Sequence, residues 1–83
     1  MNLNERSTMP KHHSKVYVEH RDGSKAEGKE VVLGFSSGMT QPAFTDRYGV
    51  AIVGHDSTGR ATVFVSGSRV GEFTAPGEKV VIV

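Results

Sequence analysis

The sequence contains no cysteine and no tryptophan, and only six of its residues are aromatic. The absence of cysteine excludes a disulfide framework, a thiolate metal site and a cysteine nucleophile. The absence of tryptophan removes the largest flat ring on which a sugar could stack. No run approaches the roughly 18 apolar residues of a membrane-spanning helix, so we expect no membrane partner.

The chain also lacks a charge excess. Ten Lys and Arg stand against nine Asp and Glu, the signs are interspersed, and the pI is about 8.1. Nucleic-acid-binding domains usually carry a basic stripe and a pI above about 9. The charge pattern therefore predicts no nucleic-acid partner, and no residue cluster indicates a cofactor.

Valine and glycine dominate what is present. The 83 residues include ten glycines, and Val, Leu, Ile and Phe together make up about a quarter of the chain. That share lies above the roughly 20% below which chains tend to stay disordered. The length allows one small domain, which we place at residues 15–83 behind a flexible N-terminal tail at 1–14.

Apolar residues alternate with polar ones along most of the domain. Val16 and Val18 alternate with Tyr17 and Glu19, and the run 60–66 alternates in the same way. A period of two is typical of half-buried strands, and no window shows helical spacing with caps. Strands are predicted from residue 15 to Glu19 and at 29–35, 43–45, 50–53, 60–66, 69–74 and 79–83. Short strands between turn signals predict an all-β fold, an antiparallel β-sandwich of about seven strands.

Aspartate and glycine mark the turns. Asp22-Gly23 is the signal of a type I′ hairpin, because glycine tolerates positive φ. Asp46 and Gly49 delimit a four-residue turn in which the carboxylate can accept backbone hydrogen bonds, and Asp56 and Gly59 repeat the spacing. The interior is expected to consist of one face of each strand: Val16, Val18, Val31, Leu33, Phe35, Phe44, Ala51, Val53, Ala61, Val63, Val65, Val70, Phe73, Val80 and Ile82.

Residues 43–53 contain Thr45-Asp46-x-x-Gly49 followed by an alternating apolar strand, and Gly59 leads a second such strand. With Val16, Val18 and Asp22-Gly23, these phrases resemble the carboxypeptidase regulatory-like, or transthyretin-like, β-sandwich family over residues 15–83. The resemblance implies an immunoglobulin-like or transthyretin-like sandwich. It also implies the role of that family's accessory domains, which is non-catalytic structural support or protein interaction.

The transthyretin-related hydrolases use a histidine–arginine–histidine cluster, for which this chain offers His20, Arg47 and His55. Those hydrolases end in Tyr-Arg-Gly-Ser, whereas this chain ends in an apolar run. We therefore expect no enzyme and keep hydrolysis as a distant third alternative. His12, His13 and His20 lack carboxylates at ligand spacing, so we expect no structural metal.

The predicted binding surface is a loop end that carries Arg47, Tyr48 and His55, with Arg69 in a neighbouring turn. An exposed Tyr48 ring would suit a carbohydrate or other ligand, which is the alternative function. The run 79–83 is typical of a central strand buried on both faces; if it is an edge instead, it would pair with a partner chain or form a homodimer. As written, the chain predicts a cytoplasmic protein, or an extracytoplasmic one if a leader or parent chain has been removed.

Overall fold

The computed structural model describes residues 9–83, which form eight strands and no helix. In chain order these are β1 (His12–Glu19), β2 (Glu30–Phe35), β3 (Gly38–Met39), β4 (Ala43–Phe44), β5 (Val50–His55), β6 (Gly59–Val65), β7 (Ser68–Ala75) and β8 (Glu78–Ile82). The all-β prediction is confirmed. Within residues 9–83 there is no helix long and apolar enough to span a membrane.

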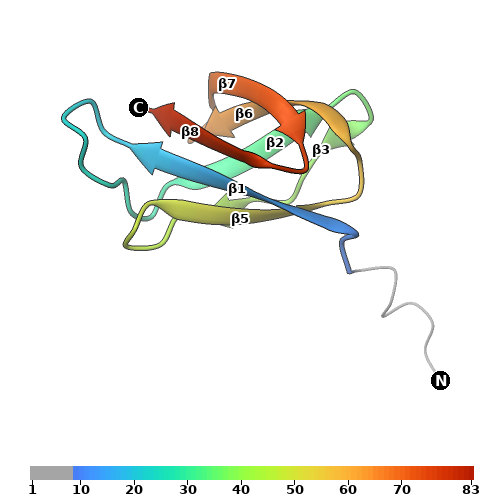
Figure 1. The fold of residues 1–83 in the computed structure, drawn as a ribbon, viewed down its shortest axis with the longest axis horizontal. Coiled ribbons are helices and arrows are strands. Elements are labelled where there is room, and N and C mark those ends of the chain that lie inside the picture. Colours follow the sequence, from blue (N-terminus) through green and yellow to red (C-terminus); the bar gives the residue numbers. More distant parts are fainter. Residues whose placement is uncertain (1–8) are drawn as a thin grey trace.

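The strands make two sheets that face each other (Figure 1). One sheet has the order β5-β1-β8, and the other has the order β3-β2-β6-β7 with β4 also paired to β2. The prediction of a wholly antiparallel fold is wrong, since β8 runs parallel to β1, with Val18 beside Val81. The extra strand beyond the expected seven is β3, two residues long, which pairs with the end of β2.

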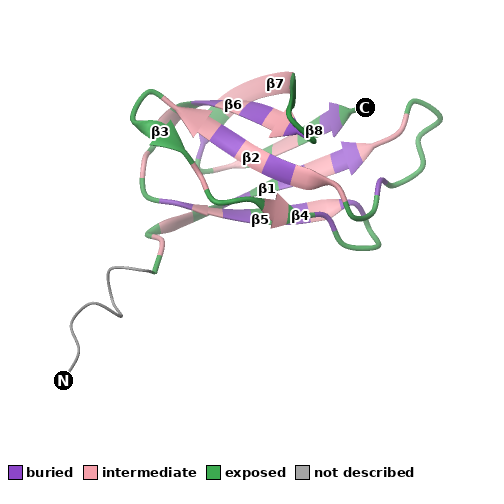
Figure 2. Cartoon of the chain, turned by 180° about the vertical axis from the view of Figure 1, so that it is seen from behind, coloured by how far each residue is buried: buried purple, intermediate pink, exposed green. Residues whose placement is uncertain are grey.

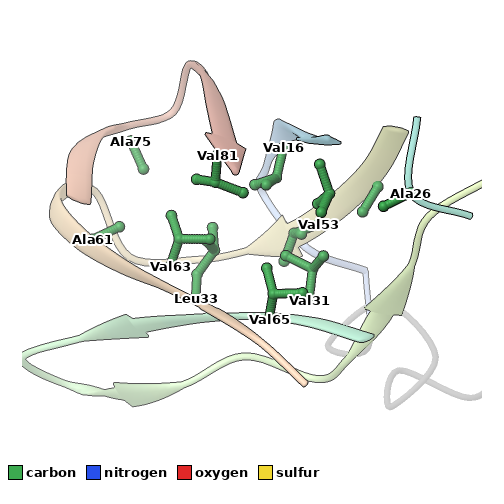
Figure 3. Close-up of a cluster of buried hydrophobic side chains, with 12 residues drawn as sticks. Val16, Ala26, Val31, Leu33, Val53, Ala61, Val63, Val65, Ala75 and Val81 are labelled. Atoms are coloured by element: carbon green, nitrogen blue, oxygen red, sulfur yellow. The ribbon is translucent and has the colours of Figure 1, made fainter. Parts of the chain in front are cut away.

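The core lies between the two sheets and is made mainly of valine and alanine (Figures 2 and 3). The alternation read from the sequence sets the inward face of β1, β2, β5 and β6, because successive strand residues point to opposite faces. The buried cluster is Val16, Val18, Ala26, Val31, Leu33, Ala51, Val53, Ala61, Val63, Val65, Ala75 and Val81. Phe35, Val70 and Phe73, also expected inside, are partly buried against it.

Three residues expected in the core lie on the surface. Phe44, Val80 and Ile82 are 62%, 54% and 59% exposed. The run 79–83 has no alternation, so its sequence did not fix which residues point inward; the pairing of β8 with β1 turns Val81 inward instead. In β4 the inward residue is Ala43, which pairs with the buried Val31.

The first strand begins three residues earlier than expected. Residues His12 to Ser14, assigned to the tail, pair with β5, and Ser14 is buried. Pro10 lies against Gly54, where a Cβ would stand 2.6 Å from the Pro10 Cγ. The alternation of apolar residues did not predict this part of β1, because its inward side chains are polar. Residues 1–8 of the predicted tail lie outside the described part.

The Asp22-Gly23 turn folds the chain back onto the end of β1, where Glu19 lies opposite Lys25 in a single antiparallel bridge and His20 donates its N–H to the Ser24 carbonyl oxygen at 2.8 Å. Gly23 has a φ of 89° and donates its N–H to the His20 carbonyl oxygen at 2.9 Å. Asp22 accepts the N–H of Ser24 at 2.9 Å and its hydroxyl at 2.7 Å, and these hydrogen bonds lower the pKa of the carboxyl. The residues thus form a turn as expected, but only Gly23 of the two has positive φ. A type I′ turn requires positive φ at both central residues, so the predicted turn type is wrong.

Candidate functional site

The turn before β5 is built as its sequence predicts. The Asp46 carboxylate accepts the N–H groups of Tyr48 at 2.8 Å and Val50 at 3.0 Å. Gly49 has a φ of 76°, and a Cβ there would stand 2.6 Å from the Val18 carbonyl oxygen. Only glycine combines this backbone angle with so close an approach. The turn therefore fixes the point at which β5 joins β1.

This turn displays Tyr48 to solvent. Its side chain is 64% exposed, and the Arg47 guanidinium carbon lies 5.5 Å from the ring centroid. At that distance a cation is attracted by the ring face. The two residues form a small exposed surface that combines an aromatic ring with a positive charge.

His55 does not belong to that surface. It is the last residue of β5, while Tyr48 precedes the first, so extended chain of about 16 Å separates the start and end of the strand. The His55 side chain is only 4% exposed. The prediction of one loop end carrying Arg47, Tyr48 and His55 is therefore wrong, because it overlooked the length of the strand between them.

His55 instead joins a buried polar network with Ser14. Its Nε2 lies 2.8 Å from the Ser14 hydroxyl, and its Nδ1 lies 2.7 Å from the Ser57 carbonyl oxygen. The Gly77 N–H donates to the Ser14 oxygen at 3.1 Å. Because a carbonyl can only accept, Nδ1 carries the proton; in the neutral ring, Nε2 then accepts from the serine hydroxyl. The network ties β1, β5 and the turn before β8 together.

The Ser14–His55 pair has the atoms of a nucleophile and a base, but its location gives it a structural role. The serine is buried, and the imidazole packs beside the rings of Phe35 and His12, with centroids 5.2 and 5.7 Å away. A nucleophile must reach a substrate carbon, and this hydroxyl lies in the interior.

The hydrolase cluster is not assembled by the fold. His20 follows the end of β1 near the turn that holds Arg47, whereas His55 lies at the far end of β5, beside His12 at the start of β1. Catalytic groups must come within hydrogen-bond reach of one substrate, and these three do not. Within residues 9–83, no group of three or more histidine, aspartate or glutamate side chains could hold a metal ion.

Arg69 lies in the other sheet and is held by an ion pair. On β7, Arg69 and Glu72 interact, and the same carboxylate bonds the Arg60 guanidinium from β6. The hydrogen bond from Arg60 and the charge of Arg69 lower the pKa of the Glu72 carboxyl. The two arginine side chains are largely exposed and that of Glu72 is 31% exposed, and ion pairs at the surface add little to stability.

The second predicted aspartate turn works differently from the first. Gly59 has a φ of 105°, as a turn glycine should. Asp56, however, accepts the N–H of Lys11 at 2.9 Å and so fastens the chain before β1. The expectation that it repeats the Asp46 arrangement is wrong, since its acceptor oxygen serves a distant segment.

One edge of the three-stranded sheet is formed by β8, and the other is formed by β5. Among the described residues only β1 pairs with β8. Lys15 donates to the Gly77 carbonyl oxygen at 3.0 Å, and Val83 donates to the Glu19 carbonyl oxygen at 2.8 Å. Because backbone groups alternate in direction along a strand, those of Glu78, Val80 and Ile82 point away from β1. We call these outward-pointing backbone groups the free edge of β8.

Comparison of the chain with protein-family models and with curated proteins found no match. Its function must therefore be argued from its own geometry.

The outer face beside the free edge carries apolar side chains next to the charged Lys15 and Glu19 of β1. Val80 and Ile82 project from β8 to the same outer face as Tyr17 of β1 and Ile52 of β5. Tyr17 neighbours Val80 in the register, and its hydroxyl donates to the Glu78 carboxylate at 3.3 Å. Edge strands are usually protected by charge, proline or a bulge, and the middle of β8 carries none on this face.

A shallow groove of about 480 Å³ lies at the opposite edge, beside β5. Pro10, Met39, Pro42 and Ile52 give it apolar walls. Neither Tyr48 nor Arg47 lines it. Sequence reasoning missed the groove and left open whether residues 79–83 form a central or an edge strand, since both features depend on which strands lie at a sheet edge.

Proposed function

We propose that the chain is a non-catalytic protein-interaction module that binds a partner strand along the free edge of β8. The observation that carries the proposal is the combination of unpaired backbone groups with exposed Val80 and Ile82 on the same strand. Such an edge is a template for strand addition, in which backbone hydrogen bonds give affinity and alternate side chains give specificity.

The proposal includes the finer fold class. Two facing sheets with a valine core fit the immunoglobulin-like or transthyretin-like sandwich that the sequence resembles. Accessory domains of that architecture act as structural or interaction modules, which agrees with a binding site on a sheet edge. The partner is a protein or a parent chain.

A phage-displayed library of short linear peptides tests this function. We expect wild-type protein to select peptides with alternating apolar residues, and Val80→Pro to lose their binding. Proline at position 80 removes an N–H that faces away from β1, so no hydrogen bond within the domain is lost. The amide spectrum of the variant checks that it is folded.

Ile52→Pro is the matched control at the other edge. Val18 donates to the Gly49 carbonyl oxygen at 2.7 Å, so by alternation Ile52 also points its N–H away from β1. Its side chain is as exposed as that of Val80. Selected peptides that bind Val80→Pro as well as wild type, or that are lost only with Ile52→Pro, would contradict the proposed function.

The second candidate is a ligand-binding module for sugars, favoured by the exposed Tyr48 ring. Planar aromatic faces pack against apolar surfaces while their polar edges stay wet. A glycan array probed with wild type and with Val80→Pro separates the two candidates, since the substitution leaves Tyr48 untouched.

A further inference from the structure

We infer that the strand received by β8 is the β8 of a second copy of this chain, paired antiparallel about a two-fold axis through Val80. The inference rests on the proposed function, because it names the partner of the same edge. It follows from three properties of the strand: the direction of its free backbone groups, its register options and its charges.

The free backbone groups are self-complementary. When the two-fold axis passes through Val80, the two Val80 residues exchange both of their N–H···O=C hydrogen bonds. Glu78 and Ile82 of the second copy exchange two such bonds as well. These are the residues whose N–H and C=O groups point away from β1. Pairing the strand with itself in this way forms up to about six backbone hydrogen bonds and leaves no outward group of the strand unpaired.

The neighbouring registers are poorer. An axis through Val81 or through Lys79 forms only about four such bonds within the strand. The Lys79 axis also places Lys79 opposite its own copy, and like charges directly opposite each other destabilise a sheet. The strand therefore has one preferred way of pairing with itself.

The charges agree with the Val80 axis. Glu78 falls opposite Ile82 and Lys79 opposite Val81, so no like charges meet across the pair. Glu78 already lies beside Lys15 and accepts the Tyr17 hydroxyl within its own chain. Pairing therefore leaves no charge buried without a partner, and an unpaired buried charge would be costly.

The outer face also becomes continuous. Val50, Tyr17 and Val80 are neighbours across the three strands, and the two-fold axis joins this row to the same row of the second copy. The joined sheet has six strands, and each β8 becomes an interior strand. Standard complexes bury about 800 Å² per partner, contributed by about 20–30 residues on each side. The five residues of β8 form a much smaller interface, so we expect the association to be weak and to depend on concentration.

Engineered cysteines test the inference cleanly because the chain has none of its own. In the proposed pair the two Val80 Cα atoms lie about 5.5 Å apart, within the range of about 4.4–6.8 Å that a disulfide spans. We expect Val80→Cys to form a covalent dimer under mild oxidation. Ile82→Cys is the matched control: it is on the same strand and similarly exposed, but its two copies are about 14 Å apart.

Tyr17→Cys controls for packing of the outer faces against each other. In the edge-paired dimer the two Tyr17 positions are three strand spacings, or about 14 Å, apart. Cross-linking at Tyr17 or at Ile82 as efficient as at Val80 would overturn the inference. So would wild-type protein that sediments as a monomer at every concentration.

The result also separates the two proposals. If Val80→Cys stays monomeric while wild type still binds library peptides through the β8 edge, the second copy is excluded and the interaction module stands. If Val80→Cys stays monomeric and wild type also binds no library peptide through the β8 edge, both the second copy and the proposed function are refuted.

Discussion

Replacing Ser14 with alanine tests the buried network that holds three parts of the chain together. The serine hydroxyl bonds the His55 Nε2 at 2.8 Å and accepts the Gly77 N–H at 3.1 Å. Among residues 9–83, no buried side-chain nitrogen or oxygen lacks a hydrogen-bond partner. Ser14→Ala would create such an atom at His55, whose side chain is only 4% exposed.

The expected loss follows from these two hydrogen bonds. A typical hydrogen bond contributes about 1 kcal/mol net, and a buried group left without a partner costs about 1–3 kcal/mol. We expect Ser14→Ala to lower the free energy of unfolding by about 2 kcal/mol. For a domain of this size that corresponds to a fall of about 10 °C in Tm.

Urea denaturation followed by circular dichroism measures the change, and an unchanged m-value shows that the same surface is exposed on unfolding. Ser57→Ala is the matched control, since the Ser57 side chain meets only the Ser37 hydroxyl at the surface, while its carbonyl still accepts from His55. We expect the control to lie within about 0.5 kcal/mol of wild type. A Ser14→Ala protein as stable as Ser57→Ala would refute the reasoning.

Two further predictions concern the turn before β5 and the ion pair on β6 and β7. Gly49→Ala and Gly67→Ala both introduce a Cβ at positive φ, but only the Cβ at position 49 meets a backbone oxygen. We expect the free energy of unfolding to fall by about 3 kcal/mol for Gly49→Ala and by about 1 kcal/mol for Gly67→Ala. Equal losses would show that the contact with the Val18 carbonyl oxygen is unimportant. The lowered pKa of Glu72 means that its contribution to stability is present above the ordinary titration range of a glutamate and is lost as pH falls through the folded-state pKa. An NMR pH titration should show this pKa returning upward when Arg60 and Arg69 are both changed to Gln, and an unmoved pKa would contradict the assigned cause.

Much of the fold is visible in the sequence because it depends on local rules. The alternation around Val16 and along β6 predicts both the strands and their inward faces, and the Asp46–Gly49 spacing predicts a turn whose hydrogen bonds are contained within it. These features need no knowledge of distant residues. The position of Tyr48 on an exposed turn follows from the same local pattern.

The features that sequence reasoning missed depend on residues far apart in the chain. His55 is buried because Ser14, 41 residues away, offers it a hydroxyl. Val81 points inward because β8 runs parallel to β1, and a uniformly apolar run carries no signal of that phase. Whether a strand lies at an edge or in the centre is decided by the whole sheet, so the same five residues were compatible with either location.

The parallel pairing of β1 with β8 has a consequence for the order of folding. Lys15 neighbours Glu78, so the three-stranded sheet joins segments from nearly opposite ends of the described chain. The entropy of closing so long a loop must be overcome before that pairing stabilises anything, which makes such topologies slow to fold. During synthesis β1 can associate with β5 long before β8 leaves the ribosome, and until then β1 is itself an unprotected edge.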